Sequence, residues 1–156
     1  MDNQQSFSII SPVYGAAGCI GELISKIDEN ISAITSDYEI ILIEDHSPDS
    51  SWDEMLKAKE TFPKLKLVQL SRNFGQHNAI AAGMELAKGD LVIVLDCDLQ
   101  HNPMYFQSLY EKIKEGNDIV YTRFFSRKHS TFKNFTAILY YRLLKFISGV
   151  DMDPNI

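Results

Sequence analysis

Short apolar runs alternate with stretches of helical periodicity along most of the chain, and this alternation restricts the fold more than any other feature. Apolar runs bounded by turn residues are typical of strands buried in a sheet. Between the runs, apolar residues recur every three or four positions, as in Gly18–Ile34, which indicates amphipathic helices. The expected strands are Phe7–Ile10, Tyr38–Ile43, Leu65–Leu70, Leu91–Leu95 and Asp118–Thr122.

Further helices are expected at Ser51–Phe62, Asn78–Ala87, Pro103–Gly116 and Phe132–Ile147. This order predicts an α/β fold, in which a mainly parallel sheet has right-handed crossovers and helices on both faces. The 156 residues suit one domain, and 45% hydrophobic residues suffice for its core. A capping box at Ser51 predicts the start of the second helix, and Gly89 is the expected C′ residue of the third.

The charged residues and the cysteines exclude several classes of protein. The formal net charge of −6 argues against nucleic-acid binding, which requires a basic surface. The basic residues gather instead between Arg123 and Lys145, where no acidic residue occurs. Cys19 and Cys97 fit no metal-binding spacing and are expected to be reduced thiols of a cytoplasmic protein. No signal peptide is recognisable, and no window approaches the ~20 apolar residues of a membrane-spanning helix.

Two carboxylates, Asp96 and Asp98, follow the apolar run Leu91–Leu95. Side chains two positions apart on an extended backbone point to the same side, so both carboxylates can face one point. Like charges so close repel each other unless a proton or a cation lies between them. A hard divalent cation, Mg²⁺ or Mn²⁺, suits these oxygens and takes its remaining ligands from water or phosphate. The alternative is a turn stabilised by aspartate, which is common in turns.

Residues that suit a nucleotide follow two other expected strands. The first strand leads into Pro12 and Tyr14, and the second leads into Asp45. Parallel strands present their carboxyl ends at one edge of the sheet, where ligands of α/β proteins bind. A tyrosine ring can stack on a nucleobase, and a carboxylate can accept from a base N–H. Tyr14 could equally be an ordinary loop aromatic, Asp45 a turn acid, and Arg72 either a base or phosphate contact or a surface arginine.

Other nucleotide and phosphate proteins are disfavoured by what the chain lacks. Neither a phosphate-binding P-loop nor the glycine fingerprint of dinucleotide-binding proteins is present. A phospho-receiver domain would need an aspartate after the third strand and a lysine after the fifth, where this chain has Ser71 and Arg123. A nucleotidyltransferase would need a basic residue in the glycine-rich loop after the first strand, and residues 15–21 contain none.

The sequence resembles the family-2 glycosyltransferases, which have the GT-A nucleotide-sugar fold. The similarity covers about Phe7 to Thr122, and five short segments occur in the order found in that family. They are Ser11–Tyr14, Ile43–Asp49, Ser71–Gly75, Ala82–Asp90 and Leu95–Pro103. The Asp-x-Asp-x-Gln pattern and the arginines after Tyr121 are most similar to the branch that glycosylates polyprenyl phosphates. Dolichyl-phosphate mannose synthases and bactoprenol glucosyltransferases belong to that branch.

The resemblance implies a role for each candidate residue. The implied nucleotide-binding residues are Pro12, Tyr14, Asp45, Arg72 and Asp96. The implied ligands of Mg²⁺ or Mn²⁺ are Asp96, Asp98 and Gln100. Arg123 and Arg127 would meet the phosphate of a lipid acceptor.

The chain departs from the family pattern at several positions. Gly15 and Ala16 stand where the family has Asn-Glu, and His46 stands where it has glycine. In the resembled enzymes the acid that acts as base comes later than residue 156, so no catalytic base is expected here. We expect an N-terminal part of a catalytic domain, with residues 123–156 beginning its acceptor side.

The resemblance implies inverting, metal-dependent transfer of a sugar from a UDP- or GDP-linked donor. The implied acceptor is a polyprenyl phosphate or a cell-surface glycan precursor, and the implied location is the cytoplasmic face of a membrane. The alternative is a nucleotide-sugar-binding module without turnover.

Overall fold

The computed structural model describes residues 5–122. The helix expected at 132–147 and the expected acceptor residues Arg123 and Arg127 therefore lie outside the described residues. The chain divides into two compact units, residues 1–108 and 109–156, and the whole sheet belongs to the first. In chain order the elements are β1 (Phe7–Val13), α1 (Ile20–Ser32), β2 (Tyr38–Glu44), α2 (Ser51–Thr61), β3 (Leu65–Gln69), α3 (Gln76–Leu86), β4 (Leu91–Val94), the 3₁₀ helix η1 (Pro103–Tyr105) and α4 (Phe106–Lys114).

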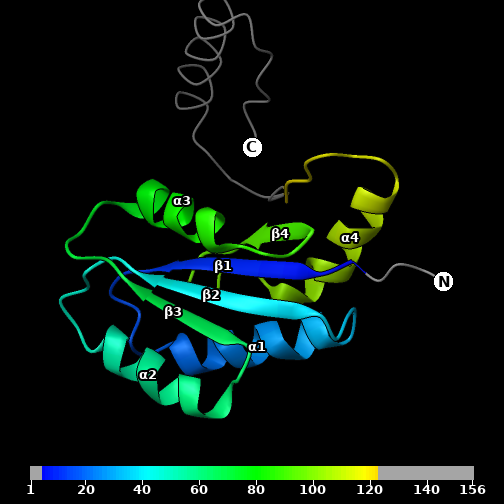
Figure 1. Cartoon of the computed structure of the whole chain (residues 1–156). Coiled ribbons are helices and arrows are strands. Elements are labelled where there is room, and N and C mark those ends of the chain that lie inside the picture. Colours follow the sequence, from blue (N-terminus) through cyan, green and yellow to red (C-terminus); the bar gives the residue numbers. More distant parts are fainter. Residues whose placement is uncertain (1–4, 123–156) are drawn as a thin grey trace, which may run out of the picture. The chain divides into compact units, whose positions relative to one another are not determined.

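The four strands form one parallel sheet in the order β3-β2-β1-β4, which confirms the predicted α/β fold. Helices α1 and α2 cover one face and α3 covers the other (Figure 1). The chain runs outward from β1 to β2 and β3, then crosses back to place β4 on the other side of β1. Ligands of open α/β sheets bind where the strand order reverses in this way, at the carboxyl ends of the strands. The topology thus directs attention to the loops after β1 and β4.

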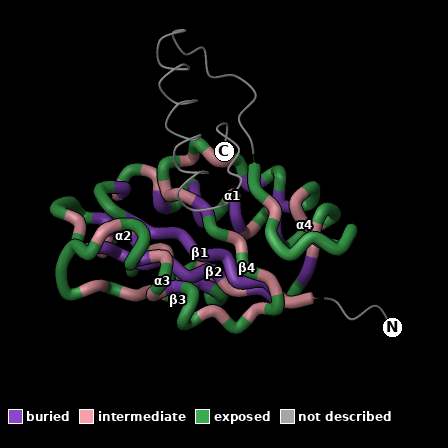
Figure 2. The backbone as a smooth tube through the Cα atoms, turned by 90° about the horizontal axis from the view of Figure 1, so that it is seen from above, coloured by how far each residue is buried: buried purple, intermediate pink, exposed green. Residues whose placement is uncertain are grey.

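The core is centred on the two inner strands, which are buried along nearly their whole length (Figure 2). Helices cover both faces of these strands, so each strand is apolar on both sides instead of alternating with polar residues. Helix α1 contributes one continuous apolar face to this core. Its fully buried residues are Ile20, Leu23, Ile24, Ile27 and Ile31.

Helix α3 packs on the sheet through small residues. Ala79 and Gly83 are buried against the core, and a Cβ at Gly83 would lie 2.5 Å from Cγ2 of Ile10 and 2.7 Å from Cδ1 of Ile43. The helix can approach this closely because glycine has no side chain. Ala79, in the first turn of α3, is fully buried and holds that end of the helix against the sheet, beside the cavity described below.

Gly83→Ala is expected to lower the free energy of unfolding by about 1–3 kcal/mol, because the added methyl group overpacks a filled core. Gly21→Ala in α1 is the matched control, since nothing lies within 4 Å of a Cβ at Gly21. That control should be neutral or stabilising by up to about 1 kcal/mol, because alanine favours helices over glycine. Urea denaturation of both variants measures the difference, and equal stabilities would contradict the close packing of α3.

The described residues differ from the sequence expectations at the outer edge of the sheet. No strand forms at Asp118–Thr122, where Ile119 and Tyr121 are exposed. A strand needs a neighbour for its backbone groups, and within the described residues no partner pairs with this segment. For the same reason β4 is an edge strand here, with Val92 and Val94 exposed, although its apolar sequence predicts burial.

Three local expectations about helix ends were also wrong. Helix α3 begins at Gln76, two residues earlier than expected, after Gly75 with a φ of +87°. Gly89 does not cap this helix; it allows close approach, because a Cβ there would lie 2.5 Å from the backbone of Phe7 and Ser8. Ser51 does not form a capping box either, since α2 has no side-chain cap and the Ser51 hydroxyl bonds Asp49.

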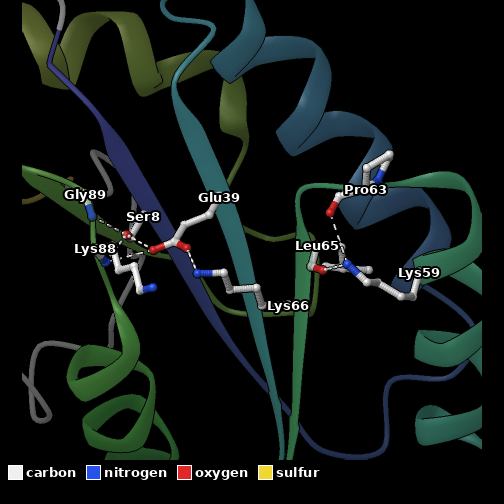
Figure 3. A network of polar contacts seen from close by, with 8 residues as sticks. All are labelled: Ser8, Glu39, Lys59, Pro63, Leu65, Lys66, Lys88 and Gly89. Atoms are coloured by element: carbon white, nitrogen blue, oxygen red, sulfur yellow. Dashed lines mark hydrogen bonds and ion pairs between the residues drawn. The ribbon is translucent and has the colours of Figure 1, made fainter.

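A polar network at the amino ends of the strands ties the sheet together (Figure 3). The Ser8 hydroxyl donates to Oε1 of Glu39 at 2.7 Å and accepts from the N–H groups of Lys88 and Gly89 at 3.1 and 2.9 Å. Glu39 also accepts from Lys88 N–H at 2.8 Å and pairs with the Lys66 ammonium. Burial alone would raise the pKa of Glu39, but the hydrogen bonds from Lys66, Ser8 and Lys88 outweigh it and lower the pKa below the ordinary 4.5.

Glu39→Gln is expected to lower the free energy of unfolding by about 1–3 kcal/mol at pH 7, since the carboxylate side chain is only 13% exposed. A lowered folded-state pKa means that the carboxylate stabilises the fold fully above pH 4.5. That stabilisation is lost as the pH falls through the folded-state pKa. In chemical denaturation, the difference in the free energy of unfolding between wild type and variant should therefore become smaller as the pH is lowered below 4.5.

The control for this prediction is Glu22→Gln, which removes an exposed ion pair with Lys26. This variant should lower the free energy of unfolding by less than about 1 kcal/mol, both at pH 7 and below pH 4.5. If the difference in the free energy of unfolding between wild type and Glu39→Gln became larger on acidification, the proposed role of the carboxylate would be contradicted.

Candidate functional site

A cavity of about 320 Å³ lies at the carboxyl edge of the sheet, at the strand-order reversal. It is formed by the loops that follow β1, β2, β3 and β4. Its lining residues are Pro12, Val13, Tyr14, Asp45, Asn73, Gly75, Gln76, Asp96, Cys97 and Asp98. The structure thus brings together five residues singled out from the sequence, which are Pro12, Tyr14, Asp45, Asp96 and Asp98.

The cavity wall that follows β1 consists of buried strand residues and an accessible tyrosine ring. Pro12 and Val13 are buried in the strand, whereas Tyr14 directly after it is 54% exposed. Gly15 follows with a φ of +64°, a left-handed conformation that costs glycine little. The tyrosine ring is therefore available to stack on a flat ligand, and its backbone is anchored by a buried strand.

The loop after Tyr14 is held by side chains of the β2–α2 loop and of the first residue of α2. Three consecutive backbone N–H groups each donate to one of these side chains. The pairs are Gly15 with Ser47 Oγ at 3.2 Å, Ala16 with Ser51 Oγ at 3.0 Å and Ala17 with Asp49 Oδ2 at 3.1 Å. The hydrogen bond from the Ser51 hydroxyl holds the pKa of Asp49 below its ordinary value. Asp49 thus stays ionised, and it links the β1–α1 loop to the start of α2.

Asp45 anchors the loop between β3 and α3. Its side chain is 3% exposed, Oδ1 accepts from Phe74 N–H at 2.7 Å and Oδ2 accepts from Gly75 N–H at 2.8 Å. A carboxylate has about four acceptor positions, and these two hydrogen bonds occupy two of them. His46, the next residue, has a φ of +57°, in the region that favours glycine. This explains why the family pattern has glycine there.

Asp96 and Asp98 lie on the cavity wall after β4, and each has a defined hydrogen-bond partner. Oδ1 of Asp96 accepts from Nε2 of Gln76 at 2.6 Å, and Oδ2 lies 3.8 Å from Nδ1 of His101. Oδ1 of Asp98 accepts from Gln100 N–H at 2.9 Å across Leu99, whose φ is +61°. Asp98 therefore stabilises a turn, as the alternative interpretation expected, whereas Asp96 is bound to the distant Gln76. Both aspartates still line the cavity.

Two other expected site residues do not line the cavity. Arg72 is exposed and its guanidinium lies over the Phe74 ring, 4.7 Å from the ring centre. The side chain of Gln100 is exposed as well, and its backbone rather than its amide contacts Asp98. Gln76 lines the cavity but was not singled out in the sequence, because the expected helix began two residues later.

The two cysteines meet next to the acidic pair. The Cys19 thiol donates to the carbonyl oxygen of Cys97 at 3.0 Å, and Cys97 lines the cavity. Burial raises the pKa of both thiols, so both are protonated at neutral pH. Both are free thiols, and Cys19 supports the backbone that carries the carboxylates.

The acidic pair fits a hard divalent cation that is shared with a ligand. Asp96 and Asp98 supply carboxylate oxygens, the ligand type that Mg²⁺ and Mn²⁺ prefer. Among residues 5–122 no group of three or more histidine, cysteine or acidic side chains is arranged to hold a metal alone. Magnesium sites in proteins commonly use one or two carboxylates together with substrate phosphates, and this arrangement suits that type.

The fold and this cavity define an α/β domain with an acidic site at the carboxyl edge of its sheet, and the comparisons specify the family. The family model described as "Glycosyl transferase family 2" matches residues 8–154. The chain therefore belongs to glycosyl transferase family 2. In the part of the chain that the structure describes, no helix is long and apolar enough to cross a membrane.

Two named relatives show the level of similarity. The chain is 38% identical to an undecaprenyl-phosphate 4-deoxy-4-formamido-L-arabinose transferase of Aeromonas hydrophila, over 93% of this chain and 45% of that protein. It is 35% identical to the uncharacterized glycosyltransferase YkcC of Bacillus subtilis, over 97% of this chain and 47% of that protein. The chain thus spans a little under half the length of these relatives.

Solved structures support the same fold. The mannosyltransferase PcManGT of Pyrobaculum calidifontis, in complex with GDP-Man and Mn²⁺, matches with a TM-score of 0.57 and 25% identity, over 62% of this chain and 28% of that one. TarS of S. aureus in complex with UDP-GlcNAc matches with a TM-score of 0.58 over 78% of this chain and 38% of that one. At 21% identity the second likeness concerns the fold alone.

Proposed function

We propose that this chain is the donor-binding part of an inverting glycosyltransferase that uses a nucleotide-diphosphate sugar and a polyprenyl phosphate acceptor. The main support is the single cavity that groups Tyr14, Asp45, Asp96 and Asp98 at the strand-order reversal. Family membership and the named activity of the Aeromonas relative agree with this proposal.

The donor would lie along the cavity from the β1 loop to the β4 loop. Tyr14 stacks on the nucleobase beside Pro12, and the two unused acceptor positions of Asp45 receive a base N–H. Asp96 and Asp98 hold Mg²⁺ or Mn²⁺, which when bound offsets the charge of the leaving nucleoside diphosphate. This assignment places the nucleobase and the diphosphate of the donor in one cavity.

Two outer residues complete the proposed donor site. Gln100, whose backbone is fixed on Asp98, is our proposed third metal ligand. Arg72, whose guanidinium lies over the Phe74 ring, is our proposed outer contact with the donor.

The proposed acceptor is a polyprenyl phosphate, because the Aeromonas relative is named for transfer that involves undecaprenyl phosphate. A phosphate oxygen is already ionised, so it can attack the sugar without a base to deprotonate it, whereas a hydroxyl acceptor needs one. We propose that Arg123 and Arg127 bind this phosphate, and that the reaction takes place at the cytoplasmic face of a membrane.

The proposal is tested by incubating the protein with Mn²⁺, UDP- or GDP-linked sugars and a short-chain polyprenyl phosphate. Mass spectrometry should detect a glycosylated polyprenyl phosphate with one donor, and inversion follows from the anomeric configuration of the product. A product with retained configuration, or a product on a hydroxyl acceptor instead, would contradict the proposed mechanism.

The alternative is a nucleotide-sugar-binding module without turnover. The same assay separates the two functions. Metal-dependent binding of a donor without any product would support the binding module.

A further inference from the structure

We infer that Gln76 is a positioning residue that orients the Asp96 carboxylate for the cation, an inference that rests on the proposed function. Gln76 is the first residue of α3 and lines the cavity. Its amide lies 2.6 Å from Oδ1 of Asp96, twenty positions later in the chain. The contact therefore joins the β3–α3 loop to the strand end that carries the acidic pair.

The chemistry of the two groups fixes the direction of this hydrogen bond. An ionised carboxylate can only accept, so the Gln76 NH₂ group must face Asp96 and the amide oxygen must lie on the other side. The amide is neutral at every pH, so it directs the carboxylate without competing with a cation for negative charge. A lysine at this place would hold Asp96 equally well but would repel the cation.

The backbone of Gln76 is itself held in place. Asp45 accepts hydrogen bonds from the two preceding N–H groups, those of Phe74 and Gly75. A continuous chain of contacts thus runs from Asp45 through Gly75 and Gln76 to Asp96. It connects the proposed nucleobase contact Asp45 to the proposed metal ligand Asp96 through the β3–α3 loop.

Residues that orient metal-binding carboxylates typically contribute 10–100-fold to metal affinity. The hydrogen bond is exposed, so it adds little to folding stability. These two facts predict that loss of the Gln76 amide weakens cation binding without unfolding the protein.

Gln76→Met keeps the length of the side chain and removes its donor. We expect the affinity for Mn²⁺, measured by electron paramagnetic resonance of free Mn²⁺ at saturating UDP or GDP, to fall about 10-fold or more. The affinity for the nucleotide without metal should stay within about 2-fold, and the melting temperature should not change. Gln69→Met is the matched control, because Gln69 is an exposed glutamine at the end of β3 that does not line the cavity.

The outcomes separate this inference from the proposed function. If the wild type binds nucleotide with Mn²⁺ and Gln76→Met has the same Mn²⁺ affinity as the wild type, the positioning role is overturned but the proposed function is not. The positioning role would also be overturned if Gln76→Met lost as much affinity for the metal-free nucleotide as for Mn²⁺, because Gln76 would then contact the nucleotide directly. A wild-type chain without any Mn²⁺-dependent nucleotide binding would overturn the proposed function itself.

Discussion

Asp98→Asn is expected to weaken Mn²⁺-dependent nucleotide binding by about 100-fold or more, equivalent to about 2.7 kcal/mol. The substitution removes one of the two cavity carboxylates that we assign to the cation, and with it half of the negative charge that this pair offers. The fold should be unaffected, because Asp98 is exposed and asparagine can still accept from Gln100 N–H. Calorimetric titration of nucleotide with and without Mn²⁺ measures the loss.

Asp53→Asn is the control for this prediction, since Asp53 is an exposed acid in the first turn of α2. It removes the same charge from the chain as a whole and should leave nucleotide affinity unchanged. If Asp98→Asn bound nucleotide and Mn²⁺ as the wild type does, the metal site would lie elsewhere.

Asp45→Ala is expected to damage stability and nucleotide binding together. The buried carboxylate accepts two backbone N–H bonds, and hydrogen bonds to charged groups contribute about 1.5–3 kcal/mol each. The free energy of unfolding should therefore fall by about 3–6 kcal/mol. Nucleotide binding should fall as well, because the loop that carries Gly75 and Gln76 into the cavity loses its anchor.

Asp45→Asn provides the graded comparison, because its amide keeps one acceptor oxygen and loses the other. Its loss of stability in chemical denaturation should lie between those of wild type and Asp45→Ala. A loss below about 1 kcal/mol in Asp45→Ala would contradict the anchoring role.

The sequence predicts the parts of this site that follow directly from strand ends. Apolar runs locate β1, β2 and β4, and parallel strands bring their carboxyl ends to one edge. Tyr14, Asp45 and Asp96 could therefore be placed around one cavity before any coordinates were known. The prediction works best for β1 and β2, which are buried along nearly their whole length and therefore leave a strong apolar signal.

The loops were less predictable, because their side chains bond to distant backbone groups. Ser51 and Asp49 look like helix-capping and turn residues, yet they hold the backbone of the β1–α1 loop. Gln76 carries no local pattern, and its partner Asp96 is twenty positions away. Burial of β4 depends on neighbours beyond the strand itself, which an apolar run cannot specify.

The central claim is that one cavity binds a nucleoside diphosphate through a metal held by Asp96 and Asp98. Thermal unfolding of the chain with UDP or with GDP, each with and without Mn²⁺, tests it most directly. We predict that one nucleotide raises the melting temperature when Mn²⁺ is present and has much less effect without it. Equal melting temperatures in all conditions, or a shift that does not depend on the metal, would contradict the claim.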